Sequence, residues 1–239
     1  MLRAILFDWG NTLVRSELEP ALLVEGHERG LDAVGGATAG RRGAFSEAYA
    51  EHVLPPLLAE RDDEVDYQAL VRSALAAAGI RHDRKAVMRF VAAEHATWRA
   101  AHPLEPATLE LLDAVRARGL RTGLVSNLFD PPVLVRGTFA ELGLLARLDA
   151  IALSAEVGWR KPAAAPFEHA LASLALTASE TAHVGDRRRE DVGGASALGM
   201  RTIQAEWYAR DDGPGPEPTE RAPTRAHVLR IVDDWLAAD

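Results

Sequence analysis

Four polar clusters, each placed after a short apolar run, contain the residues best suited to chemistry in this sequence. In chain order they are Asp8, Ser126 with Asn127, Arg160 with Lys161, and Asp186 with Asp191. A carboxylate can act as a nucleophile that forms a covalent intermediate, while hydroxyl and ammonium groups can hold an anion. These residue types together suit the transfer of an anionic group, provided that the fold brings them to one place.

Three of these residues, Asp8, Asp186 and Asp191, are carboxylates. Unpaired carboxylates that crowd together repel one another unless they are protonated or bound to a cation. The chain has no cysteine, and a site with oxygen ligands alone favours Mg²⁺ over zinc. We therefore expect Mg²⁺ as a cofactor.

The elements that must position these clusters alternate between strand and helix. Apolar runs typical of strands lie at residues 2–7, 122–125, 150–153, 182–184 and 202–203. Helical patterns separate the last four of them, and repeated units of this kind predict a doubly wound, parallel α/β sheet covered on both faces. The carboxyl ends of parallel strands share one edge, so the clusters are expected to converge there.

Residues 17–103 interrupt this alternation, because their apolar residues recur at helical spacing without a strand pattern. We therefore expect an α/β core formed by residues 1–15 plus 104–239, with an α-helical cap at residues 16–103. A loop rich in glycine and proline is expected at 211–218, before a final helix at 226–236.

Composition narrows the function classes. The chain has 239 residues, of which 48% are hydrophobic, so it can bury a full core. Its formal net charge of -8 argues against nucleic acid as a partner. No run approaches the roughly 18 consecutive apolar residues of a membrane span, and the N-terminus lacks a secretion signal. We expect a cytoplasmic protein that acts on a small molecule and has no membrane partner.

With these motifs in view, the sequence strongly resembles the haloacid dehalogenase superfamily. The matching segments are Asp8–Leu13, Leu124–Asn127, Glu156–Pro162 and Val184–Asp191. The resemblance implies a hydrolase with a helical cap after its first strand and Asp8 as its nucleophile. By the same resemblance, the Ser126 hydroxyl and the Asn127 backbone N–H would bind phosphoryl oxygens, and Lys161 would hold both the phosphoryl group and Asp8.

The resemblance also implies a ligand set for the metal. Asp8, the backbone carbonyl of Gly10 and Asp186 would hold Mg²⁺, with Asp191 a further ligand or a support. Thr12 matches the family position that contacts this loop and can orient Asp8. Asn11 stands where the family usually has glycine, and asparagine is among the non-glycine residues that best adopt positive φ.

Gly10 is the main departure from the family pattern. Phosphatases that the sequence resembles have an aspartate there, which protonates the leaving group and then activates water. Glycine does neither, and general acid–base catalysis is typically worth about 10²- to 10⁴-fold. The preferred interpretation is a Mg²⁺-dependent phosphohydrolase of a small phosphorylated metabolite, working through an aspartyl-phosphate on Asp8. Either its leaving group is good, or the cap supplies an acid, with Glu17, Glu19, His27 and His52 as candidates.

Three alternatives stay open. A carbon–halogen hydrolase acting on a halogenated substrate needs no proton for its leaving group, but Gly185-Asp186 counts against it, because such relatives lack that metal motif. A phosphonate-cleaving enzyme needs a cap lysine for a Schiff base, and only Lys85 is available. A catalytically impaired protein that binds phosphate is the third, in which Arg187, Arg188 and Arg189 add anion affinity unless they pair with acidic neighbours.

Overall fold

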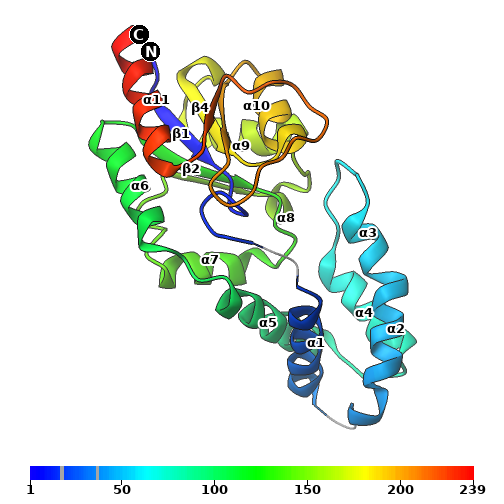
Figure 1. Cartoon of the computed structure of the whole chain (residues 1–239). Helices are drawn as coiled ribbons and strands as arrows, with labels where there is room; N and C mark the ends of the chain where they lie inside the picture. The colour runs from blue at the N-terminus through cyan, green and yellow to red at the C-terminus, as the bar shows by residue number, and fades with distance from the viewer. Residues whose placement is uncertain (17–18, 36–37) are drawn as a thin grey trace.

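A six-stranded parallel sheet forms the centre of the computed structural model, which describes residues 1–16, 19–35 and 38–239. Its strand order is β3-β2-β1-β4-β5-β6. The strands are β1 (Ala4–Phe7), β2 (Arg121–Ser126), β3 (Ala150–Leu153), β4 (Thr181–Gly185), β5 (Arg201–Ala205) and β6 (Glu220–Ala222). β1 thus lies between β2 and β4, and the predicted doubly wound α/β fold is confirmed (Figure 1).

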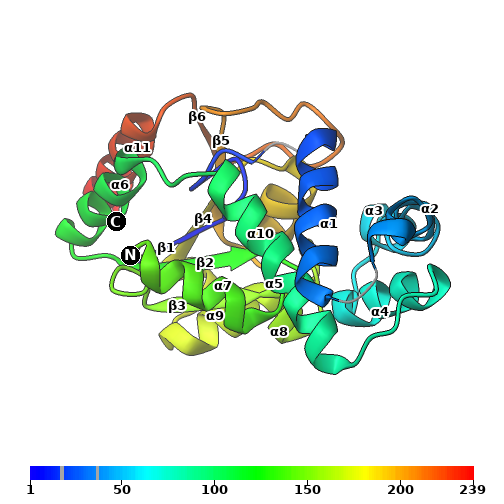
Figure 2. The same ribbon diagram turned by 90° about the horizontal axis from the view of Figure 1, so that it is seen from below.

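Helices cover both faces of this sheet. They are α6 (Pro106–Ala117), α7 (Pro132–Glu141), α8 (Ser154–Val157), α9 (Ala164–Leu174), α10 (Gly194–Ala197) and α11 (Arg225–Ala238). Leu112, Phe139 and Val228, from α6, α7 and α11, share a core with Ile5 and Phe7. On the other face, α9 and α10 pack over Ala4 and Leu6. Figure 2 shows the helices around the sheet from below. All four residues of β1 are buried, as expected for a central parallel strand.

The remaining helices form a second cluster to one side of the sheet (Figure 1). They are α1 (Pro20–Val34), α2 (Arg42–His52), α3 (Leu54–Leu58), α4 (Tyr67–Ala77) and α5 (Arg84–Ala101), with a short 3₁₀ turn at Ala39–Arg41. Their apolar faces share a separate core that includes Phe45, Val71 and Phe90. Gly30 lets α1 approach α5 closely, because a Cβ at this position would lie 2.6 Å from the Phe90 ring. Among the described helices, none is long and apolar enough to cross a membrane.

The structure adds elements that the sequence analysis missed. Residues 188–193 form a π-helical turn, and β6 lies between the loop at 211–218 and α11. The three residues of β6 are Glu220, Arg221 and Ala222, a run without an apolar pattern that would indicate a strand. The final helix spans Arg225–Ala238, slightly longer than the expected 226–236.

Candidate active site

Asp8 lies directly after β1, where the neighbouring strands also end. Its backbone N–H donates to the carbonyl of Val184 in β4 at 2.9 Å. Its carboxylate accepts a 2.9 Å hydrogen bond from the Ser126 hydroxyl, at the end of β2. Both side chains are buried. The parallel register thus brings two of the predicted clusters into direct contact.

Lys161 links Asp8 to Asp191. Its ammonium lies 2.6 Å from Oδ1 of Asp8 and 2.5 Å from Oδ1 of Asp191, and the residue is only 3% exposed. Although burial lowers the pKa of Lys161, the two carboxylates outweigh burial and raise this pKa above its usual value. The ammonium therefore stays charged at neutral pH, as an anion-binding role requires.

Segments from both parts of the molecule hold Lys161 in place. The Asn127 side chain hydrogen-bonds the Lys161 backbone. On the other side, the N–H of Arg160 donates to the carbonyl of Asp62 at 2.6 Å, and the N–H of Glu64 donates to Gly158 at 3.0 Å. The loop before α4 therefore contacts the segment that carries the lysine.

Three buried carboxylates, Asp8, Asp186 and Asp191, present oxygen atoms that all lie within 4.8 Å of one another. Burial and repulsion by the other two carboxylates raise the pKa of Asp186 to about 8, and burial also raises the pKa of Asp8. Burial raises the pKa of Asp191 too, but Lys161 and His183 outweigh it and hold the pKa below its usual value. A hard divalent cation would relieve the strain on Asp8 and Asp186, so the oxygen ligands fit Mg²⁺.

Both oxygens of Asp191 already accept hydrogen bonds. Oδ1 accepts from Lys161 and lies 2.9 Å from Nε2 of His183, and Oδ2 accepts from the backbone N–H of Arg187 at 3.0 Å. Sequence reasoning missed His183, whose only signal was a polar residue within the apolar run at 182–184. It also missed why Gly185 precedes Asp186. A Cβ on Gly185 would lie 2.2 Å from Cγ of Asp191, so only glycine leaves room for this carboxylate.

The loop after Asp8 holds Gly10, Asn11 and Thr12. Asn11 adopts a φ of 50°, the positive φ expected of it, and its Oδ1 accepts from the Ser16 N–H at 3.0 Å. Thr12 is fully buried and its carbonyl accepts from Nε1 of Trp207, but its hydroxyl has no hydrogen-bond partner among the described residues. A hydroxyl contact from Thr12 to Asp8 is therefore not part of this arrangement.

None of the three candidate acids that the structure describes forms a hydrogen bond or ion pair with Asp8. Glu19 and His52 are exposed, and Glu17 lies outside the described residues. His27 is buried against the rings of Phe45 and Tyr49, with the Tyr49 centroid 4.0 Å away. Burial lowers the pKa of His27 to about 4, so its imidazole is neutral at physiological pH.

The other basic residues singled out in the sequence are either exposed or paired with acidic side chains. Lys85 is exposed in the first turn of α5, which removes the burial that a Schiff-base lysine needs. The three consecutive arginines pair with acidic neighbours. The pairs are Arg187 with Glu190, Arg188 with Glu217, and Arg189 with Glu190 and Asp62.

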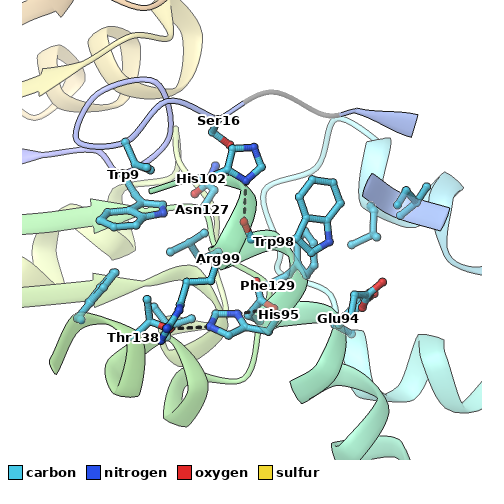
Figure 3. Close-up of a pocket in the computed structure, with 18 of the residues that line it drawn as sticks. Trp9, Ser16, Glu94, His95, Trp98, Arg99, His102, Asn127, Phe129 and Thr138 are labelled. Atoms are coloured by element: carbon cyan, nitrogen blue, oxygen red, sulfur yellow. Dashed lines mark hydrogen bonds and ion pairs between the residues drawn. The ribbon is translucent and has the colours of Figure 1, made fainter. Parts of the chain in front are cut away.

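A cavity of about 350 Å³ lies beside the loops that follow Asp8 and Ser126. Trp9, which follows Asp8, and Asn127, which follows Ser126, both line it. Opposite them, α5 contributes Glu94, His95, Trp98 and Arg99, and His102 directly follows this helix (Figure 3). The cavity therefore lies between the loops that follow β1 and β2 and the helical cluster.

Comparisons with known proteins agree with this architecture. A family model described as "Hydrolase: haloacid dehalogenase-like hydrolase" matches residues 2–199. A protein named phosphoserine phosphatase from Thermus thermophilus is 34% identical over 135 residues, which cover 56% of this chain and 50% of that protein. A protein named glyceraldehyde 3-phosphate phosphatase from Methanocaldococcus jannaschii is 27% identical over 207 residues, covering 85% of each chain. The chain spans about half the length of several curated relatives that it matches.

Solved structures show the same fold. The crystal structure of a 2-haloacid dehalogenase from Pseudomonas syringae superposes with a TM-score of 0.69 at 20% identity, over 98% of this chain and 100% of that chain. At this identity the likeness concerns the fold alone.

Proposed function

The chain belongs to the haloacid dehalogenase-like hydrolases, and on this premise we propose that it is a Mg²⁺-dependent phosphohydrolase acting on a small phosphorylated metabolite. The observation that carries the proposal is the contact of Asp8 with both Ser126 and Lys161 beside two further buried carboxylates. We further propose that residues 1–15 and 104–239 form the catalytic core and residues 16–103 its cap, in a protein of the cytoplasm.

The proposed reaction has two steps. A carboxylate oxygen of Asp8 attacks phosphorus, and the bond from phosphorus to the leaving-group oxygen breaks, which forms an aspartyl-phosphate. Water then attacks this intermediate, releasing inorganic phosphate and restoring the carboxylate. Ser126 and Lys161 contribute a hydroxyl and an ammonium that bind the phosphoryl oxygens, together with the Asn127 backbone N–H.

Asp8 and Asp186, with the carbonyl of Gly10, are the proposed ligands of Mg²⁺. Asp191 is assigned a supporting role, because both of its oxygens are engaged by Lys161, His183 and the Arg187 backbone. Bound Mg²⁺ would neutralise negative charge on the carboxylates and on the phosphoryl group.

Phosphate rather than halide release is the favoured reaction. Release of a halide needs no metal cation. The crowding of Asp8, Asp186 and Asp191, in contrast, calls for a cation that neutralises their charge. The relatives named as phosphatases support the same choice.

Hydrolysis of p-nitrophenyl phosphate tests the proposal, because its aryl leaving group hardly needs the acid that Gly10 cannot supply. We expect turnover with Mg²⁺, its loss with EDTA, and a loss of at least 10³-fold in Asp8→Asn, since a neutral amide removes the nucleophile. Asp234→Asn, an exposed position on α11, is the matched control and should keep full activity. Full activity of Asp8→Asn, or indifference to chelation, would overturn the proposal and direct attention to halide release.

A further inference from the structure

The cavity next to the loop after Asp8, which Trp9 lines but Asp8 does not, has walls that are mainly apolar and aromatic. Trp9 and Phe139 form one side, with ring centroids 4.9 Å apart. Phe129 from the loop after β2 and Trp98 from α5 form another, as Figure 3 shows for the two labelled side chains. Leucines of α3, such as Leu57, also line it. Its volume of about 350 Å³ lies in the range of cavities that enclose small organic ligands.

Two charged side chains of the cavity, His95 and Arg99, have acidic partners within the protein, whereas Oε1 of Glu94 has no hydrogen-bond partner among the described residues. The ring of His95 lies 3.2 Å from the Asp130 carboxylate and 2.9 Å from the Thr138 hydroxyl, and Arg99 forms an ion pair with Glu141. A substrate carboxylate or second phosphate entering here would meet the carboxyl groups of Glu94 and Asp130, and it would compete with acidic groups for His95 and Arg99. The cavity is therefore poorly suited to a small, highly charged leaving group.

Gly10 gives an independent reason to expect a particular leaving group. Without an aspartate at this position, the loop after Asp8 offers the leaving group no acid, and this loop would leave an aliphatic alcohol to depart as a poorly stabilised alkoxide. A phenol is far more acidic than an aliphatic alcohol and can depart as a phenolate. The missing acid and the aromatic walls thus both favour a phenol as the leaving group.

We propose that the leaving group of the natural substrate is an apolar phenol, which occupies the cavity between Trp9, Trp98 and Phe129. This inference rests on the proposed phosphohydrolase function. In the reaction, the bond from Asp8 to phosphorus forms as the bond from phosphorus to the aryl oxygen breaks. The phenolate leaves with the electron pair and takes a proton from water. The apolar walls then contact the ring that the cleaved ester carried.

Three phosphates separate the inference from the function on which it rests. Acetyl phosphate is small and has a good leaving group, so its hydrolysis reports phosphoryl transfer without the cavity. Phenyl phosphate and 2-naphthyl phosphate have leaving groups of similar acidity but different apolar area. We expect kcat/KM for 2-naphthyl phosphate to exceed that for phenyl phosphate by about tenfold, from the added apolar surface that the cavity buries.

A charge placed in the wall provides the second arm. Leu57→Asp should lower the ratio of kcat/KM for 2-naphthyl phosphate to that for acetyl phosphate by about tenfold or more, because the carboxylate must be desolvated beside the ring. Phe129→Asn, in a loop, should lower the same ratio if Leu57→Asp does not fold. Leu145→Asp is the matched control, since Leu145 is 40% exposed and lies outside the cavity. It should leave both values unchanged.

Equal kcat/KM for the two aryl phosphates in the wild type would overturn the inference, as would an unchanged ratio in the folded wall variants. Acetyl phosphate hydrolysis that still depends on Asp8 would in that case leave the phosphohydrolase function standing. If acetyl phosphate is not hydrolysed in an Asp8-dependent way, the proposed function fails and the inference fails with it.

Discussion

The side chain of Asn127 forms two hydrogen bonds with the backbone of Lys161 and so acts as a clamp on it. Its Nδ2 donates to the Lys161 carbonyl at 3.0 Å, and its Oδ1 accepts from the Lys161 N–H at 2.7 Å. The two residues are 34 positions apart in the chain. This clamp joins the end of β2 to the segment beyond β3 and thereby places the Lys161 ammonium beside Asp8.

Removing the clamp should reduce the rate more than substrate binding. In Asn127→Leu the Lys161 backbone loses both hydrogen bonds, and a shift of about 1 Å in a catalytic group can cost on the order of 10²-fold. We expect kcat for p-nitrophenyl phosphate to fall about 10- to 100-fold with a smaller change in KM. Asn127→Asp keeps the oxygen that accepts from the Lys161 N–H, so its kcat should fall less. A kcat at the wild-type level in Asn127→Leu would contradict a positioning role.

Restoring the absent acid should change the reaction in a defined way. A Cβ on Gly10 would meet nothing closer than Cβ of Ser16 at 3.7 Å, so the site has room for a side chain there. Gly10→Asp should raise turnover of glycerol phosphate at least tenfold, because general acid catalysis is worth about 10²- to 10⁴-fold in suitable geometry. Steady-state assays of the wild type and Gly10→Asp with glycerol phosphate check the expectation.

Gly10→Asn is the matched control, since it has the same shape without a proton to donate. An equal gain in both variants would point to an effect of shape alone. No gain in Gly10→Asp would indicate that another group already supplies the proton.

Gly185 should tolerate no side chain. In Gly185→Ala the new methyl group would overlap the Asp191 carboxylate and push it away from Lys161 and His183. We expect activity to fall at least 100-fold and the Mg²⁺ concentration for half-maximal activity to rise, measured by titration of the metal. Gly43→Ala on α2, where a Cβ meets nothing within 4 Å, should behave as the wild type. Normal Mg²⁺ dependence in Gly185→Ala would argue against the supporting role of Asp191.

Glu94 should make the protein less stable as the pH rises. Burial raises the pKa of this carboxyl to about 8 from its ordinary value of 4.5, and the side chain is in contact with the Tyr67 hydroxyl. The folded state holds this proton more tightly than the unfolded state. The stability that Glu94 contributes is therefore fully present below pH 4.5 and is lost as the pH rises toward 8. His27, whose pKa burial lowers to about 4, opposes this trend between about pH 4 and 6.5.

Between pH 6.5 and 8 His27 no longer opposes the trend, but Asp186, whose pKa is also raised to about 8, acts in the same direction, so the share of Glu94 is read from its variant. Over that interval we expect the wild type to lose about 2 kcal/mol of unfolding free energy through this group, since each pKa unit is worth about 1.36 kcal/mol. Glu94→Gln should flatten the decline, as measured by urea unfolding at several pH values. Glu51→Gln, at an exposed position, is the control. An unchanged slope in Glu94→Gln would show that this carboxyl is not the titrating group.

Local patterns in the sequence determined the sheet and the identity of the polar residues at its edge. The apolar runs before Asp8, Ser126 and Asp186 predicted parallel strands, and the shared direction of such strands made their ends converge. Helical spacing likewise predicted the cluster between residues 17 and 103. β6 escaped this reasoning because three polar and small residues on an outer strand carry no periodic pattern.

Only the tertiary structure decided how the polar residues meet. The clamp between Asn127 and Lys161 and the contact of His183 with Asp191 depend on side-chain directions set by the packing of separate segments. The aromatic character of the cavity arises in the same way, from Trp9 and Trp98, which lie in different elements far apart in sequence. Periodicity and turn chemistry act over a few neighbouring residues, whereas these contacts exist only once the sheet and the helices have packed together.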